Sequence, residues 1–332
     1  MDFLKQIVVL SLIVASGITA ASPTKLQKEF VDLMVAKHQF ERTEVENILA
    51  RASKNDDILK AIARPWEAKP WHQYYPIFLT EKRLKKGLEF WHKHQNALER
   101  AELETGVPAQ VIVAIIGVES FYGTYTGKYS VLDALVTLGF HYPRRATFFR
   151  SELAELFILA KEEQLDISQL KGSYAGAMGW GQFIPSSYRH YAVDFDHDGS
   201  RDLFSNPVDA IGSVANYFKK NGWQANSAVA YPAQVVGNSY KKLLTKSRKF
   251  SHSWAELKAA GISVDEVNFA DDKSVKLFEF EQPKSNEYWV ALKNFYVIMR
   301  YNHSPLYAMA VFQFSQQLKN SFSQTYPNQN PS

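Results

Sequence analysis

The sequence predicts a mainly α-helical protein with a small β region, an α+β chain. Two observations lead to this prediction. Most segments place apolar residues three and four positions apart, which is the spacing of one helix face. Alternation of apolar and polar residues, the pattern of a half-buried strand, is confined to residues 264–300, for example KLFEFE.

The bulk properties favour a globular protein without a nucleic-acid partner. Of the 332 residues, 46% are hydrophobic, which is enough for a well-filled core. The net charge is +4, and lysine and arginine are spread along the chain. A nucleic-acid-binding surface needs them clustered, so we expect no nucleic acid. The absence of cysteine excludes disulfides, thiolate chemistry and a lipid-modified N-terminal cysteine, so no lipid anchor is expected.

The first 20 residues predict a signal peptide. Lys5 provides the basic start, residues 7–14 the apolar segment, and residues 18–20, ITA, a small-residue cleavage site. Serine and glycine interrupt the apolar run, so an uncleaved membrane anchor is the less favoured interpretation. We expect residues 21–332 to be exported as a soluble protein of the periplasm.

The N-terminal region predicts helices around one irregular connection. Residues 24–40 and 43–52 have the pattern of short amphipathic helices. The connection 63–78 is rich in aromatic residues, and its three prolines disfavour regular helix. Residues 80–101 predict one long helix that Thr80 caps. Its apolar face comprises Leu84, Leu88, Trp91 and Leu98.

The stretch 108–123, PAQVIVAIIGVESFYG, carries the strongest chemical signal. Glu119 falls on one helix face with Ile112, Ile115 and Ile116. A carboxyl group removed from water on such a face has a raised pKa and can hold a proton near neutral pH, as a general acid must. The alternative is a core glutamate satisfied by an arginine or by backbone amides.

Further helices are predicted at 130–138, 146–162 and 206–221. Between them, residues 170–188 read LKGSYAGAMGWGQFIPSSY. These small residues let the backbone approach a ligand or another helix closely.

The C-terminal part carries the β signal. Residues 224–251 give only a weak pattern, and 253–260 predict a short helix. The stretches KLFEFE and YWVALKNFYVIM predict a small antiparallel sheet or hairpins. Residues 305–318 predict a closing helix, and the polar tail 324–332 is expected to be disordered.

Residues 194–202, DFDHDGSRD, have the front half of an EF-hand calcium loop. Carboxylates, the turn glycine and an oxygen donor stand at the positions where a calcium loop needs them. The usual closing glutamate is replaced by Ser205, and Asp209 could close a longer loop, 194–209. We expect a structural Ca²⁺ and no catalytic cofactor, the alternative being a metal-free Asp/Gly turn. The expected ligands are Asp194, Asp196, Asp198, Ser200 and Asp209.

Several motifs in one order resemble the lytic murein transglycosylase B family: GVESFYG, KGSYAGAMGWGQFIPSSY, DFDHDG and NPVDAIGSVANYFKKNGW. The resemblance covers about residues 60–223 and resumes at MRYNHSPLYAMAVFQFS. It implies a lysozyme-like catalytic core at 60–223, a helical region before it, and a C-terminal region with a small β part at about 224–320. It also implies that peptidoglycan glycan strands are cleaved at the β-1,4 bond between MurNAc and GlcNAc, leaving 1,6-anhydromuramoyl ends.

The resemblance also implies roles for single residues. Glu119 would be the lone catalytic acid and afterwards the base, with the substrate's N-acetyl group replacing the usual second carboxylate. Tyrosine faces suit pyranose rings, and amides can bond N-acetyl groups. The matching groove positions are Ser173 and Gln182 near the acid, Arg144 and Arg145 at glycan subsites, Tyr217, Tyr301 and Asn302 around the scissile bond, and Tyr307 and Tyr74 as outlying aromatics.

The chain departs from the family pattern at three places. Ser120 stands where threonine is common, the loop 194–209 is one residue longer, and residues 225–275 match least. Two other functions therefore stay open. A lysozyme-type peptidoglycan hydrolase needs a second carboxylate, for which Asp133 is the nearest in sequence, and the third possibility is a non-catalytic peptidoglycan-binding protein. We expect a monomer, with cell-wall synthesis proteins as further partners.

Overall fold

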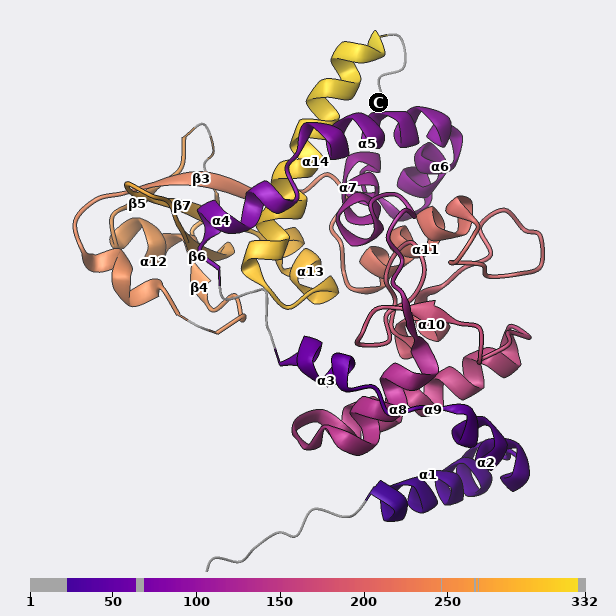
Figure 1. Ribbon diagram of the computed structural model, residues 1–332. Coiled ribbons are helices and arrows are strands. Elements are labelled where there is room, and N and C mark those ends of the chain that lie inside the picture. The colour runs from indigo at the N-terminus through magenta and orange to yellow at the C-terminus, as the bar shows by residue number, and fades with distance from the viewer. Residues whose placement is uncertain (1–22, 64–68, 246, 266, 268, 328–332) are drawn as a thin grey trace, which may run out of the picture.

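The computed structural model describes residues 23–63, 69–245, 247–265, 267 and 269–327, so the predicted signal peptide lies outside the described residues. The described chain is mainly helical with a small antiparallel sheet, which confirms the predicted fold class (Figure 1). Its α-helices are α1 (Pro23–His38), α2 (Arg42–Arg51), α3 (Asp56–Ile62), α4 (Trp71–Tyr74), α5 (Glu81–Lys93), α6 (Gln95–Thr105), α7 (Ala109–Ser120), α8 (Val131–His141), α9 (Ala146–Glu162), α10 (Pro185–Tyr191), α11 (Pro207–Lys220), α12 (Trp254–Ala259), α13 (Lys293–Tyr301) and α14 (Pro305–Thr325). The described residues also form the 3₁₀ turns η2 (Tyr75–Ile77), η3 (Pro143–Arg145) and η4 (Ser239–Leu243).

The larger sheet is antiparallel, with the strand order β4-β6-β7-β3-β5. Its strands are β3 (Ala230–Val235), β4 (His252–Ser253), β5 (Ile262–Ser263), β6 (Ser274–Glu281) and β7 (Asn286–Ala291). With α12 it encloses a small apolar cluster of its own that includes Trp254, Leu257 and Leu277. A second pair, β1 (Tyr129–Ser130) with β2 (Lys171–Gly172), lies among the helices.

Helix α7 lies at the centre of the larger core. Its isoleucines at 112, 115 and 116 are fully buried, and α5, α6, α11 and α14 pack around it. At the other end of the molecule, α1 and α3 pack against α8, and α1 also contacts α9 (Figure 1). A helix covered on this many sides must be apolar nearly throughout. The one acidic residue of α7, Glu119, is therefore exceptional.

Polar caps begin several of the helices. Thr80 accepts a hydrogen bond from the Arg83 amide at 3.2 Å, which confirms the predicted cap of α5. Asn206 accepts the Val208 amide at the start of α11. Ser253 and Glu256 form a reciprocal capping box at the start of α12.

Two predicted helix boundaries are wrong. The single helix predicted at 80–101 is divided into α5 and α6 by His94, whose φ of −112° and ψ of 23° leave the helical region. The ring of this half-buried histidine packs 4.7 Å from that of Phe90. The disordered tail was also predicted to begin too early, at residue 324, because α14 continues to Thr325. Phe322 is buried and stacks on Trp91 with 4.3 Å between ring centroids, which holds this last turn in place.

Two further segments differ from the prediction. The stretch KNFYVIM belongs to α13 and not to a strand. Its buried residues, Phe295, Val297, Ile298 and Met299, cover more than one helix face, and this produced an apparent alternation. In the connection 63–78, α4 and η2 form helical turns because Pro70 and Pro76 stand at turn starts, where no amide is needed.

No single helix in the described ranges is long and apolar enough to span a membrane. Taken together, α6 and α7 have the length and apolar composition of a membrane span, but a bend of 114° separates the two helices.

Candidate active site

Glu119 lies in the last turn of α7 and is half-buried. Burial away from water raises the pKa of its carboxyl group from 4.5 to about 7, and a hydrogen bond from Tyr307 acts in the opposite direction. With a pKa near 7, both the protonated and the ionised forms are accessible at neutral pH. The group can therefore release a proton and take one up again.

Tyr307, in the first turn of α14, is the direct partner of the carboxyl group. Its hydroxyl donates to Oε1 of Glu119 at 2.5 Å, across 188 residues of sequence. Burial and the charge of Glu119 hold the pKa of this phenol well above 10, so it stays a donor. The prediction that Tyr307 is an outlying aromatic is therefore wrong, because Tyr307 contacts Glu119 directly. Tyr74, buried in α4, also contributes to the raised pKa of Tyr307, which places Tyr74 near the same point.

The end of α7 is held in an unusual backbone conformation. Phe121, Tyr122 and Gly123 follow Glu119 and Ser120 with φ values of 51°, 56° and 75°, all left-handed. The Ser120 hydroxyl accepts the Gly123 amide at 3.0 Å. A Cβ at residue 123 would come within 2.5 Å of Trp180, so only glycine fits there.

Arg83 supports the same helix end, and no pattern in the sequence marks it as a site residue. Its guanidinium donates to the carbonyl of Gly117 at 3.1 Å and to the carbonyls of Ile77 and Phe78 at 2.8 and 2.5 Å. Burial lowers the pKa of this arginine. Arg83 thus ties the last turn of α7 to the segment that follows Tyr74.

Two of the predicted groove residues, Tyr301 and Tyr217, donate hydrogen bonds to backbone carbonyls and pack on each other. Tyr301 donates to the Gly181 carbonyl at 2.6 Å, and the charge of Glu119 contributes to its raised pKa. Tyr217 is buried, and its hydroxyl donates to the Arg300 carbonyl at 2.6 Å. The two tyrosine rings pack 4.7 Å apart. Tyr301 therefore lies close enough to Glu119 to interact with its charge, and Tyr217 packs against the ring of Tyr301.

Gln182 and Ser173 shape the glycine-rich stretch. Gln182 has a φ of 50°, and its side-chain amide donates to the carbonyls of Thr126 and Gly179, both at 3.0 Å. The Ser173 hydroxyl accepts the Ala175 and Ala177 amides. In the described part of the chain no donor to the carbonyl oxygen of the Gln182 side chain is found, so this oxygen can accept a hydrogen bond from a ligand.

Other predicted residues stand apart from this group. Arg144 and Arg145 are exposed in η3, and Arg145 lies over the Phe148 ring at 4.1 Å. Asn302 ends α13. Asp133 accepts the Ser53 amide at 2.8 Å, and no other carboxylate among the described residues acts on the pKa of Glu119. A second carboxylate for water activation is thus not found beside Glu119 in the described part of the chain.

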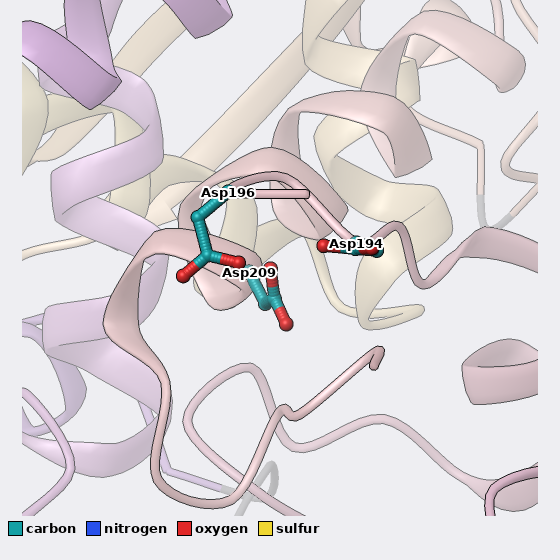
Figure 2. Close-up of side chains that lie close together, drawn as sticks. All are labelled: Asp194, Asp196 and Asp209. Atoms are coloured by element: carbon teal, nitrogen blue, oxygen red, sulfur yellow. The ribbon is translucent and has the colours of Figure 1, made fainter. Parts of the chain in front are cut away.

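The acidic loop brings three carboxylates together. One oxygen each of Asp194, Asp196 and Asp209 lies within 4.8 Å of the others. Figure 2 shows these three side chains close together. Asp209 is fully buried, its carboxylate accepts the Phe195 and Asp202 amides, and burial raises its pKa. Hard cations with several oxygen ligands suit such a set.

One of the five predicted ligands is placed differently. Asp198 is outside the group of three, and its carboxylate accepts the Ser200 amide at 2.9 Å. Asp209 closes the longer loop, where Ser205 replaces the usual glutamate; the Ser205 hydroxyl donates to Asp202 instead.

A family model described as "Transglycosylase SLT domain" matches residues 23–316. The membrane-bound lytic murein transglycosylase B of Escherichia coli K12 is 43% identical over 299 residues, covering 87% of this chain and 81% of that protein. The soluble lytic transglycosylase SltB1 of Pseudomonas aeruginosa is 47% identical, with a TM-score of 0.85 over 90% of this chain and 99% of its own.

Two solved complexes show ligands of relatives. The E. coli lytic transglycosylase Slt35 in complex with calcium is 42% identical, with a TM-score of 0.83 over 90% of this chain and 94% of its own. SltB3 of P. aeruginosa in complex with NAG-NAM-pentapeptide is 28% identical, with a TM-score of 0.79 over 91% of this chain and 81% of its own.

Proposed function

We propose a mechanism for this chain from the premise that it belongs to the transglycosylase SLT domain family and is a lytic murein transglycosylase with a lysozyme-like fold. In this mechanism a single carboxyl group cleaves the β-1,4 bond between MurNAc and GlcNAc and leaves 1,6-anhydromuramoyl ends. The observation that carries it is Glu119, half-buried with a pKa of about 7 and without a carboxylate neighbour in the described chain.

The reaction needs one proton to leave Glu119 and one to return. The protonated carboxyl gives its proton to the glycosidic oxygen as the bond from C1 to that oxygen breaks. The C6 hydroxyl oxygen of the same muramoyl residue then bonds to C1, and its proton passes to the Glu119 carboxylate. Glu119 ends as it began, and no water is consumed. The substrate's N-acetyl group supports the charge that develops at C1 between these two events.

The surrounding side chains position the carboxyl group and the sugar. Tyr307 orients Glu119 through its hydrogen bond, and Tyr301 offers a ring face beside it. Gln182 and Ser173 contribute the polar edge of the groove, and Asn302, Arg144 and Arg145 extend it as outer contacts.

We also propose that the acidic loop binds Ca²⁺ structurally, through Asp194, Asp196 and Asp209. The buried Asp209 beside two other carboxylates supports this, since a cation would relieve their mutual repulsion. Calcium in the Slt35 complex supports it as well. The ion would brace the loop before α11, the helix that carries Tyr217.

The protein would act in the periplasm as an exported chain, with peptidoglycan glycan strands as its substrate. The relatives include one membrane-bound and one soluble enzyme, and both names fit action on the cell wall.

The experiment is release of soluble fragments from purified peptidoglycan, comparing the parent chain with Glu119→Gln. We expect a loss of about 10²- to 10⁴-fold in release rate, the range for removing a general acid or base. Pelleting with peptidoglycan should show unchanged binding, and Glu89→Gln, an exposed residue of α5, should retain activity. A Glu119→Gln protein as active as the parent would contradict the mechanism.

A further inference from the structure

One face of α13 is strongly basic. Lys293, Tyr296 and Arg300 stand three and four positions apart, so their side chains share this face. Two cavities of about 400 and 380 Å³ lie against it, and Lys249 and Tyr296 line both. We call these two adjoining cavities the α13 pocket.

The charges around the α13 pocket all have one sign. Its basic lining residues are Arg248, Lys249, Lys293, Arg300 and His303, and no described lining residue is acidic. Two of them have neutral partners: Arg300 donates to Asn221 at 2.9 Å, and Lys293 lies over the Tyr296 ring at 5.0 Å. Clustered cations without carboxylates create a positive potential that attracts an anion.

The pocket also has an apolar side. The rings of Phe250 and Tyr296 pack 5.8 Å apart, and Met299 lines the second cavity. A bare inorganic anion would gain nothing from this surface. A chain molecule that carries carboxylates together with apolar side chains, such as a short peptide, fits both properties.

The pocket adjoins the proposed glycan groove. Asn302, an expected sugar contact, stands between the lining residues Arg300 and His303. The Arg300 carbonyl accepts the hydroxyl of Tyr217, which packs on Tyr301. Arg300 and His303 thus stand only one or two residues from Asn302 along the chain, so a peptide attached to a muramoyl unit near Asn302 would begin beside these basic residues.

We propose that the α13 pocket binds the carboxylates of the peptide stem on the glycan strand being cleaved. The proposal rests on the proposed function, because it assumes that the strand lies in the groove beside Asn302. The pentapeptide-bearing fragment bound by SltB3 supports this class of ligand.

The test compares substrates with and without the stem. Lys249→Glu combined with Lys293→Glu reverses two exposed charges, and glutamate in the first turn of α13 is favourable, so the variant should fold. We expect kcat/KM on stem-bearing glycan strands to fall about tenfold at low salt, and less at high salt. On strands stripped of peptide by an amidase, kcat/KM should be unchanged.

The control is Lys241→Glu combined with Lys242→Glu, which makes the same charge change on η4, outside both cavities. Equal losses on both substrates, or equal losses in both variants, would overturn the proposal. Calorimetry with NAG-NAM-pentapeptide and with the NAG-NAM disaccharide decides the question without cleavage. NAG-NAM-pentapeptide should bind the Lys249/Lys293 variant more weakly than the parent chain, and the disaccharide should bind both equally. If the parent chain cleaves neither strand, the proposed function fails, and calorimetry still tests the pocket.

Discussion

The acidity of Glu119 is set by two opposing influences. Burial at the end of an apolar helix disfavours the carboxylate, and the Tyr307 hydroxyl favours it by donating a hydrogen bond. The result is a pKa of about 7, where the group can act first as an acid and then as a base. The tyrosine thus keeps the carboxyl group from remaining protonated throughout the reaction.

Replacing Tyr307 should move the pH profile. Tyr307→Phe removes the donor, so the pKa of Glu119 rises above about 7 and more of the carboxyl group stays protonated at alkaline pH. We expect the alkaline limb of kcat to move to higher pH. The check is a pH–rate profile on muropeptide release, with Tyr326→Phe, at the far end of α14, as the control. A limb at the same pH in Tyr307→Phe would contradict this role.

The burial of Glu119 should also lower the free energy of unfolding of the protein at pH values above the acidic range. Between about pH 4.5 and pH 7, folded Glu119 holds a proton that the unfolded chain has lost, so the free energy of unfolding falls as pH rises. Glu119→Gln removes this penalty. We expect the variant to be more stable by about 1–2 kcal/mol at pH ~8, discounted for partial exposure, and to gain nothing at pH ~4. Urea unfolding measures both; an equal difference at the two pH values would be inconsistent with this cause.

At the scale of elements, Arg83 joins three segments of the site. It lies on α5 and bonds the carbonyls of α7 and of the turn after Tyr74. Arg83→Ala leaves these carbonyls without their donor, and we expect a loss of about 2–4 kcal/mol in the free energy of unfolding. Lys82→Ala, the exposed neighbour, is the matched control. Denaturant titration tests the pair, and equal effects would argue against a specific role for Arg83.

The acidic loop should respond to calcium. At about a hundred times its Kd, calcium should raise the Tm of the parent protein by roughly 5 °C. Asp196→Ala, which removes one of the three converging carboxylates, should abolish the rise, whereas Asp198→Ala should retain most of it. Thermal unfolding with and without a chelator measures this. A parent protein whose Tm ignores calcium would refute the metal site.

Helices and their caps could be predicted where they depend on residues that are close together in the sequence. The cap at Thr80 confirms its prediction, because a cap is a contact within a few residues. The break at His94 and the helical form of α13 depend on packing from several sides, which an apolar pattern along the chain does not reveal. Arg83 was missed for the same reason, since its partners are carbonyls that sequence does not distinguish.

At the scale of the whole molecule, the site is assembled from distant parts of the chain. The isoleucine spacing in α7 identified Glu119, a local relation that survives folding. Its partner Tyr307 follows 188 residues later and reaches it only because α14 packs on α7. The resemblance to a family implied only an outlying aromatic at Tyr307 and did not reveal its contact with Glu119. The structure therefore adds the burial that raises the pKa of Glu119 and the hydrogen bond that limits this rise.

The central claim is that one carboxyl group performs the cleavage without water. The most direct test is mass spectrometry of muropeptides released from purified peptidoglycan by the parent protein and by Glu119→Gln. We predict products with anhydromuramoyl ends, one water lighter than hydrolysis products, and their loss in the variant. Products with reducing muramic acid ends would contradict the account and require a second carboxylate acting on water.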